Sequence, residues 1–248
     1  MKRCLDIFAS FFGLLCLCPV LGVFLLLIWL QDFHSPFYIA PRVRRRGELF
    51  SMIKLRSMVV NADKVGGSST ATTDRRVTWV GRLIRRYKLD EFSQLWNVLK
   101  GEMSLVGPRP QVQSDVNLYS DEEYHLFDVK PGITDFSSIV FSDEGEILKG
   151  SSDPDQHYNH VIRPWKSRLG LFYVKHHSIS VDLWLVALTV IAIILRPKAL
   201  AGVQRLLRKR GADEQLIQVA GRSEPLVPYP PPGMQTVETR TSTSQAIL

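Results

Sequence analysis

Cysteine is scarce in this sequence, and the few cysteines present are poorly placed for chemistry. The 248 residues include three, Cys4, Cys16 and Cys18, and all lie in or beside one apolar stretch near the N-terminus. They have no ligand-like partners and no spacing that indicates a bridge. We therefore interpret them as small apolar residues, not as a disulfide framework or a metal site.

Several common functional motifs are also missing. The sequence has no internal repeat and no glycine-rich phosphate loop of either common type. His157 and His160 have a spacing that could ligate a metal, but no Cys or second pair accompanies them. The net charge of +7 suits nucleic acid, anionic lipid or phosphorylated small molecules. The basic residues are not interleaved with aromatic ones as in base-stacking proteins, which argues against nucleic acid.

Charge is absent from Ile7 to Leu30, a run long enough to cross a hydrocarbon core of about 30 Å as a helix. A signal peptide fits poorly, because the run is too long and no small-residue cleavage site follows it.

The apolar run also has features that argue against a simple crossing. Pro19 lies in its middle, where it removes a backbone hydrogen bond and clashes with the preceding turn. Both flanks are basic: Lys2 and Arg3 precede the run, and an arginine cluster at residues 42–46 follows it. The positive-inside tendency then favours both ends on the cytoplasmic side. A re-entrant helix with a break at Cys18-Pro19 satisfies both constraints, and a kinked spanning helix is the alternative.

The middle of the chain has the pattern of a mixed soluble domain, from about Tyr38 to Asp182. Leu49–Met58 alternates like a strand. Residues 61–76 are rich in Gly, Ser and Thr and lack apolar periodicity, which is typical of a mobile loop. Two helical pieces are expected to meet near Asp90, and Gly101 is expected to end the second piece.

The far end is expected to lie on the membrane surface. Val181–Leu195 is apolar but too short to span comfortably, so we expect an interfacial helix. The basic residues of 205–210 suit anionic lipid, although a solvated helix face is an equal alternative. Pro, Ser and Thr dominate from Gly221 onward, which predicts a disordered tail. The predicted organisation is therefore 1–36 membrane helix, 37–200 catalytic domain, 201–220 basic amphipathic segment and 221–248 tail.

Asp90 and Glu91 are the first candidates for chemistry. Asp90 stands where an N-cap is expected, ahead of the sequence FSQLWNVLKG. A helix start favours an ionised carboxylate, which can act as a nucleophile or a metal ligand. The alternative is an ordinary capping residue.

The sequence Gly107-Pro108-Arg109-Pro110 is the second candidate. Prolines on both sides restrict the backbone and would hold the Arg109 guanidinium in one direction, where its planar fork suits a phosphate. A rigid surface turn is the alternative. Other basic residues surround the carboxylate pair in sequence: Lys54, Arg56, Arg82, Arg85, Arg86 and Lys88. Of these, Lys54, Arg56 and Arg86 are candidate phosphate ligands. Carboxylates among so many cations indicate phosphate substrates held with a divalent metal.

The sequence blocks that contain these residues resemble those of a known family. From about Lys2 to Leu195 it resembles the small monotopic phosphoglycosyl transferases, also called bacterial sugar transferases. The blocks that carry the resemblance, in order, are KRCLDI, the apolar run with its central proline, LFSMIKLRSM, LIRRYKLDEFSQLWNVLKGEMSLVGPRP and VKPGITDFSSI. The long block from Leu83 to Pro110 is highly specific.

The resemblance implies an α/β fold: a re-entrant helix-break-helix, then a compact catalytic domain with interfacial helices on the cytoplasmic face of the inner membrane. It implies transfer of a sugar 1-phosphate from a UDP-sugar to polyprenol phosphate, with Mg²⁺. Asp90 matches the family's nucleophile, and Glu91 its partner carboxylate for the metal or the lipid phosphate. Arg109 matches a phosphate-holding arginine, and Lys54 and Arg86 lie in similarly basic blocks.

Some questions stay open at this level. Cys18 stands where the family often has Ser, and the segment DFSSIVFSDEGEIL after Thr134 departs from the pattern of many members, so sugar specificity does not carry over. The oligomeric state is undetermined, and a homo-oligomer is compatible with the sequence. Two other classes compete with the transferase: a non-catalytic module that binds phospholipid or polyprenol phosphate, and a membrane phosphohydrolase that uses the same carboxylate.

Overall fold

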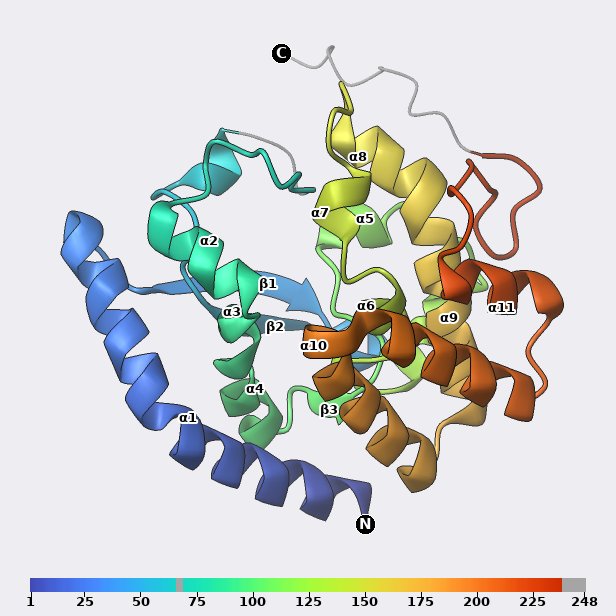
Figure 1. Ribbon diagram of the computed structural model, residues 1–248, viewed down its shortest axis with the longest axis horizontal. Coiled ribbons are helices and arrows are strands. Elements are labelled where there is room, and N and C mark those ends of the chain that lie inside the picture. Colours follow the sequence, from blue (N-terminus) through green and yellow to red (C-terminus); the bar gives the residue numbers. More distant parts are fainter. Residues whose placement is uncertain (66–68, 238–248) are drawn as a thin grey trace.

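The first helix, α1 (Lys2–Asp32), is long and apolar and bends near its middle (Figure 1). The structure is a computed structural model that describes residues 1–65 and 69–237. Pro19 lies inside α1 near the bend, as expected where a proline removes a backbone hydrogen bond. The expected break at Cys18-Pro19 is therefore a bend within one continuous helix. Most large apolar side chains along α1 are exposed.

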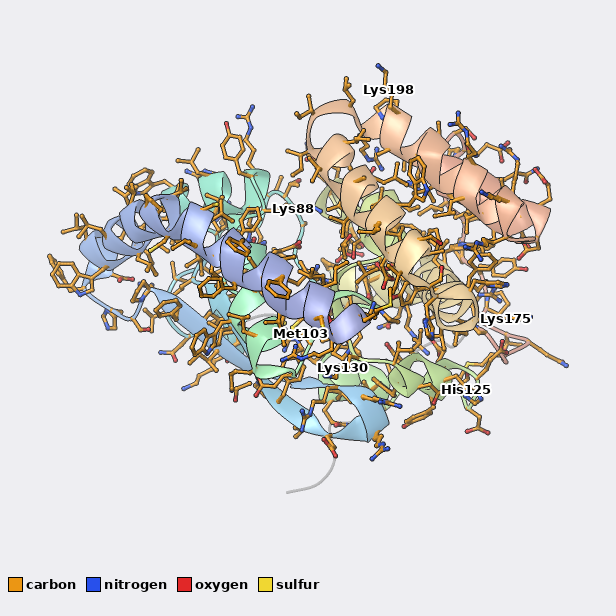
Figure 2. The ribbon with its side chains drawn as sticks, turned by 90° about the horizontal axis from the view of Figure 1, so that it is seen from below. Lys88, Met103, His125, Lys130, Lys175 and Lys198 are labelled. Carbon is orange, nitrogen blue, oxygen red and sulfur yellow. The ribbon has the colours of Figure 1, made fainter. Side chains whose placement is uncertain are left out.

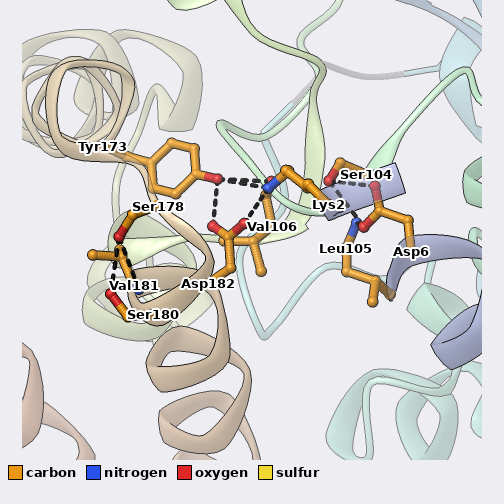
Figure 3. Close-up of polar contacts among 10 residues, drawn as sticks. All are labelled: Lys2, Asp6, Ser104, Leu105, Val106, Tyr173, Ser178, Ser180, Val181 and Asp182. Carbon is orange, nitrogen blue, oxygen red and sulfur yellow. Dashed lines mark hydrogen bonds and ion pairs between the residues drawn. The ribbon is translucent and has the colours of Figure 1, made fainter. Parts of the chain in front are cut away.

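Polar contacts fix the start of α1 to the rest of the molecule (Figure 3). The Lys2 ammonium donates to the carboxylate of Asp182 at 2.6 Å and to the carbonyl of Val106 at 2.9 Å. One turn later, the Asp6 carboxylate accepts hydrogen bonds from the hydroxyl of Ser104. The end of α1 is held as well, because Asp32 forms a two-point ion pair with Arg56, with both N–O distances 2.6 Å.

Two small sheets form the β structure. Strands β1 (Phe37–Val43) and β2 (Leu49–Leu55) pair antiparallel, with Tyr38 opposite Lys54. The alternating sequence at Leu49–Met58 thus forms a strand, three residues shorter than predicted. Strands β3 (Ser104–Val106) and β4 (Gly132–Thr134) pair parallel.

Short helices connect the sheets and carry the central part of the chain. Between β2 and β3 lie α2 (Trp79–Arg86), α3 (Leu89–Phe92) and α4 (Leu95–Lys100). Gly101 ends α4 with φ +85°, as the sequence predicts. Further helices follow: α5 (Gln113–Val116), α6 (Phe136–Val140), α7 (Glu144–Ile147), α8 (Pro154–His157) and α9 (Arg163–His176). Short 3-10 helices cover Arg45–Gly47, Ala62–Lys64 and Glu123–Asp128, and a π-helical turn covers Tyr158–Ile162.

The second long apolar helix, α10 (Ile179–Lys209), folds back on itself. Its backbone leaves the helical region at Leu195 (φ −133°, ψ 62°), and Pro197 follows. The two limbs then lie side by side (Figure 1). A Cβ atom on Gly202 would stand 2.3 Å from a methyl of Leu188, so with glycine at this position the limbs pack closely without a shift of the Leu188 side chain. Both α1 and α10 have the length and composition of membrane spans, but the break makes α10 a hairpin.

The C-terminal region differs from its predicted organisation. The expected boundary at residue 200 falls inside α10, and buried residues of its second limb and of α11 (Glu214–Gly221) belong to the largest hydrophobic core: Val203, Leu207, Leu216, Ile217 and Ala220. Residues 222–237 are not disordered, because Tyr229 stacks on Trp165 at 4.4 Å and Arg168 donates to the carbonyl of Pro230. The rest of the predicted tail, 238–248, lies outside the described residues.

Candidate active site

Asp90 and Glu91 lie at the start of α3, in a position that the sequence places only in part. The N-cap is Lys88, whose φ of +53° turns the chain sharply between α2 and α3. Asp90 is therefore not the cap, as the sequence suggested, but lies in the first turn with Glu91. A carboxylate there still faces the positive end of the backbone dipoles. The hydroxyl of Ser93 donates to the carbonyl of Asp90 and secures the turn.

Both carboxylates line a cavity of about 320 Å³. Its charged lining comes from segments far apart in the sequence: the cations are Arg42, Lys54, Arg85, Lys88, Arg109 and Lys166, and the carboxylates are Asp90, Glu91, Asp115 and Glu144. Figure 2 shows Lys88 between the ribbon of α2 and the α10 hairpin. A concave, cation-rich pocket with a carboxylate pair suits an anionic ligand.

Lys54 reaches the nucleophile candidate from β2. Alternation along the strand sends Lys54 into the pocket, while its neighbours Ile53 and Leu55 face the apolar side of the sheet. Its ammonium lies 3.9 Å from the nearer carboxylate oxygen of Asp90. Burial and, next to it, the charge of Arg109 lower the pKa of Lys54 to about 8. Burial raises the pKa of Asp90, while the charge of Lys54 opposes that change.

Arg109 holds the other carboxylate. Its guanidinium donates to Glu91 at 2.9 Å. Burial by itself would raise the pKa of Glu91, but Arg109, Lys88 and Lys54 outweigh it and hold that pKa below its usual range. The charge of Glu91 in turn raises the pKa of Arg109. The two carboxylates therefore differ in their electrostatic surroundings, which stabilise the anion of Glu91 more strongly than the anion of Asp90.

The backbone around Arg109 is fixed by the parallel β3–β4 pair. The amide of Gly132 donates to the carbonyl of Pro108 at 2.9 Å. A Cβ atom on Gly132 would come within 2.1 Å of the Gly107 amide nitrogen, so the two strands approach this closely only with glycine. The Gly-Pro-Arg-Pro frame therefore sets the direction of the Arg109 side chain by strand pairing as well as by its prolines.

Two predicted phosphate ligands lie elsewhere. Arg56 is buried against α1, where it pairs with Asp32 and donates to the carbonyl of Ser35. Arg86 is exposed beside the ring of Tyr87. Neither lines the pocket, and the neighbour of Arg86, Arg85, lines it instead.

Other pocket residues were missed by reasoning from the sequence. Glu144 and Lys166 form an ion pair at 2.5 Å in the pocket lining, and Arg42 enters from β1. Arg42 and Lys166 have no sequence signal beyond their charge. Glu144 lies in the segment that departs from the family pattern, and that departure was the available signal.

The residues present fit a magnesium ion of the kind held by few protein ligands. Asp90 and Glu91 supply hard carboxylate oxygens beside cations that suit phosphates, and Mg²⁺ is commonly bound by one or two carboxylates plus substrate phosphate. Within residues 1–65 and 69–237, no group of three His, Cys, Asp or Glu side chains forms a metal cage. His157 and His160 accordingly belong to no such cluster.

Comparison with known proteins assigns most of the chain to one family. The model of the bacterial sugar transferase family matches residues 1–196, which include α1, the pocket carboxylates and the first limb of α10. The chain belongs to the bacterial sugar transferase family. The match ends before the second limb of α10, so α11 and residues 222–237 lie outside it.

Individual relatives support the same assignment. The chain is 37% identical over 196 residues to the undecaprenyl-phosphate glucose phosphotransferase of Komagataeibacter xylinus, covering 76% of this chain and 35% of that protein. It is 38% identical over 149 residues to the undecaprenyl-phosphate galactose phosphotransferase of Salmonella typhimurium, covering 54% and 31%. It is 34% identical over 191 residues to EpsL, an uncharacterized sugar transferase of Bacillus subtilis, covering 77% and 85%. The chain thus spans about a third of the length of the first two relatives.

Proposed function

We propose that this protein is a phosphoglycosyl transferase that moves a sugar 1-phosphate from a UDP-sugar to polyprenol phosphate and so initiates glycan assembly. The observation that carries the proposal is the pocket in which Asp90 and Glu91 meet Lys54 and Arg109. The family membership and the undecaprenyl-phosphate relatives support the donor and acceptor classes. Phosphoryl transfer depends mainly on positioning and charge neutralisation, and the cations of this pocket provide both.

In the first step, a carboxylate oxygen of Asp90 attacks the β-phosphorus of the UDP-sugar. The bond from that phosphorus to the oxygen bridging the two phosphates breaks, UMP leaves, and the sugar phosphate remains as an ester on Asp90. In the second step, a phosphate oxygen of polyprenol phosphate attacks the same phosphorus and releases the Asp90 carboxylate. The lipid then carries the sugar through a diphosphate.

The neighbouring residues have separate roles in this scheme. Lys54 favours the ionised form of Asp90 against the effect of burial, since its ammonium lies 3.9 Å from that carboxylate. Arg109 orients Glu91 at 2.9 Å and has four further N–H donors for the phosphates. Asp90 and Glu91 would hold Mg²⁺, which would supply neutralisation of the phosphate charge.

The proposed location is the cytoplasmic face of the inner membrane, with α1 as a re-entrant, monotopic anchor. Both ends of α1 are bound to the same body, through Lys2–Asp182 and Arg56–Asp32, which supports placing them on one side of the bilayer. The tip of the α10 hairpin, residues 190–195, exposes mainly apolar side chains, including Ile194 at 80% exposure. An interfacial role for this tip is consistent with apolar insertion beside basic residues that contact anionic lipid.

The experiment that tests the mechanism uses mass spectrometry. The purified full-length chain in detergent is mixed with UDP-galactose, UDP-glucose or UDP-N-acetylgalactosamine and Mg²⁺ without lipid, then denatured and digested. We expect a sugar-phosphate adduct on the peptide that contains Asp90, and none with Asp90→Asn or with EDTA. The exposed Asp63 provides a matched control, because Asp63→Asn should leave the adduct in place.

Turnover separates this function from its competitors. UMP release that increases when polyprenol phosphate is added supports the transferase. Release of inorganic phosphate would favour a phosphohydrolase, and the absence of any uridine product would favour a binding module. Full activity in Asp90→Asn, or an adduct on another peptide, would reject Asp90 as the nucleophile.

A further inference from the structure

One part of the pocket lining carries hydroxyl groups and a carboxylate. Ser138, Ser142 and Glu144 line the cavity from α6, α7 and the turn between them. Figure 1 shows α6 and α7 across from α2 and α3, which carry Arg85, Asp90 and Glu91. We call residues 138–144 the α6–α7 wall.

The local fold of this wall is specified by its sequence. Asp135 caps α6, since its carboxylate accepts a hydrogen bond from the amide of Ser138 at 2.7 Å. The chain then turns, and the amide of Glu144 donates to the carbonyl of Phe141. Glu144 thereby enters the pocket in the first turn of α7, where Lys166 binds it at 2.5 Å. Burial opposes the charge of Glu144, but Lys166 outweighs burial and keeps the pKa of this carboxyl low.

Two arginines from the C-terminal part of the chain hold the wall at Asp143. Arg196, directly after the break in α10, lies 2.8 Å from one oxygen of Asp143 and also donates to the hydroxyl of Ser142 at 3.1 Å. Arg222, directly after α11, lies 3.5 Å from the other oxygen of Asp143 and sits over the ring of Phe141. Arg222 belongs to the region beyond the family match, so that region reaches back to the pocket.

The hydrogen bond from Arg196 leaves the hydroxyl of Ser142 able to act as a donor in the pocket. Because its oxygen accepts from the Nε–H of Arg196, its own proton remains available for an acceptor in the pocket. Glu144 carries two oxygens, and Lys166 is bound to one of them. The wall therefore presents both donors and acceptors to the cavity, whereas at Asp90 and Glu91 the carboxylates stand among the cations Lys54, Lys88 and Arg109.

We infer that the α6–α7 wall is the sugar-recognising side of the pocket. Glu144 and Ser142 form hydrogen bonds with sugar hydroxyls. Asp143, Arg196 and Arg222 position Glu144 and Ser142. The inference rests on the proposed function. If Asp90 attacks the β-phosphorus, the phosphates lie on the side of the pocket that carries Asp90 and Arg109, and the sugar lies toward the α6–α7 wall. A sugar hydroxyl needs an acceptor for its proton, and the anionic Glu144 supplies one. A site that bonds a hydroxyl also rejects analogues that lack it, because its own polar groups would be left unpaired.

The first test compares UDP with UDP-sugars. Binding of UDP, UDP-galactose, UDP-glucose and UDP-N-acetylgalactosamine to the full-length chain is measured by calorimetry for wild type and Glu144→Gln. We expect the affinity of the preferred UDP-sugar to fall roughly 10- to 150-fold, the range for a hydrogen bond to a charged group, and that of UDP to stay unchanged. Equal loss for UDP and UDP-sugar would assign Glu144 to the nucleotide, and unchanged affinities for both would remove its role.

The second test examines the positioning arginine. Arg222→Met should raise KM for the UDP-sugar more than it lowers kcat and should narrow the difference between sugars, while Arg222→Lys restores part of that difference. Arg75, an exposed arginine in the segment before α2, gives the matched control Arg75→Met. Unchanged sugar discrimination in Arg222→Met, with normal thermal unfolding, would overturn the positioning role. Failure of the proposed function would look different, since wild type would then neither bind UDP nor release UMP.

Discussion

Lys54 should take up a proton when the pocket fills with an anionic ligand. Its side chain is 21% exposed, it lies 3.9 Å from Asp90, and burial lowers its pKa from the usual 10.5 to about 8. At about 1.4 kcal/mol for each pH unit, keeping Lys54 charged in the empty pocket costs roughly 3 kcal/mol. A bound diphosphate would recover much of this cost by favouring the ammonium.

The sign of the pH dependence follows directly. Below pH 8 Lys54 is already protonated, so binding of a UDP-sugar takes up little or no proton there. Between pH 8 and 10.5 the empty pocket has lost the proton, and binding restores it. We therefore expect uptake that approaches one proton per ligand at pH 9, and an affinity that falls up to tenfold from pH 8 to pH 9.

Isothermal titration calorimetry measures this uptake in buffers that differ in ionisation enthalpy. The titrations use a UDP-sugar with wild type and with Lys54→Met, each at pH 6.5 and pH 9. Only wild type at pH 9 should show buffer-dependent heat beyond that of the variant. At pH 6.5 Lys54→Met should weaken binding by roughly 1.5–3 kcal/mol, as expected when a charged hydrogen bond is lost. Equal proton uptake by both proteins at pH 9, or none by wild type, would refute the reasoning.

The remaining predictions concern the phosphate ligand, the membrane helix and the packing of α2. Arg109→Lys should lower kcat/KM roughly 10- to 150-fold, since an ammonium cannot reproduce the guanidinium fork. The control Arg82→Lys, on the exposed face of α2, should leave kcat/KM unchanged. Near-normal kinetics of Arg109→Lys would mean that Arg109 has only a structural role in the turn. Pro19→Ala should straighten α1 and favour a spanning helix, because an interior proline costs a helix about 3 kcal/mol. Cysteine labelling from both sides of the membrane, near residues 1 and 45, would show on which side each end of α1 lies. Labelling of the two ends of wild type from opposite sides would contradict the re-entrant anchor. A Cβ atom on Gly81 would stand 1.8 Å from the carbonyl oxygen of Ser57, so Gly81→Ala should lower Tm by several degrees, while Gly22→Ala, in open space, should not; equal Tm values would show that α2 shifts freely.

Much of the candidate site follows from local sequence. Asp90 and Glu91 are adjacent in the chain, and a short helix brings both to one cavity. Arg109 is directed by its own prolines, and Lys54 by the alternation of its strand. These placements depend on a few neighbouring residues, so the sequence contains the information needed to predict them.

Other features depend on which distant segments meet, and a single sequence does not encode that in a readable pattern. Arg56 belongs to a basic block yet pairs with Asp32, because the end of α1 returns to β2. Arg85 faces the pocket and Arg86 does not, because the packing of α2 sets its rotation. Glu144 becomes a pocket residue only because Lys166 and the Asp143 contacts close the α6–α7 wall.

The two ends of the chain show the same division. Composition determined that α1 and the first limb of α10 are apolar helices, since the hydrophobicity of a segment depends only on its own residues. Tertiary structure decided that α10 is a hairpin, in which the chain breaks at Leu195 and Gly202 packs against Leu188. It also decided that residues 222–237 are ordered, through the stacking of Tyr229 on Trp165. A Pro-rich segment cannot form a core of its own, but a core made by other segments can bind it, and composition carries no information about such a partner.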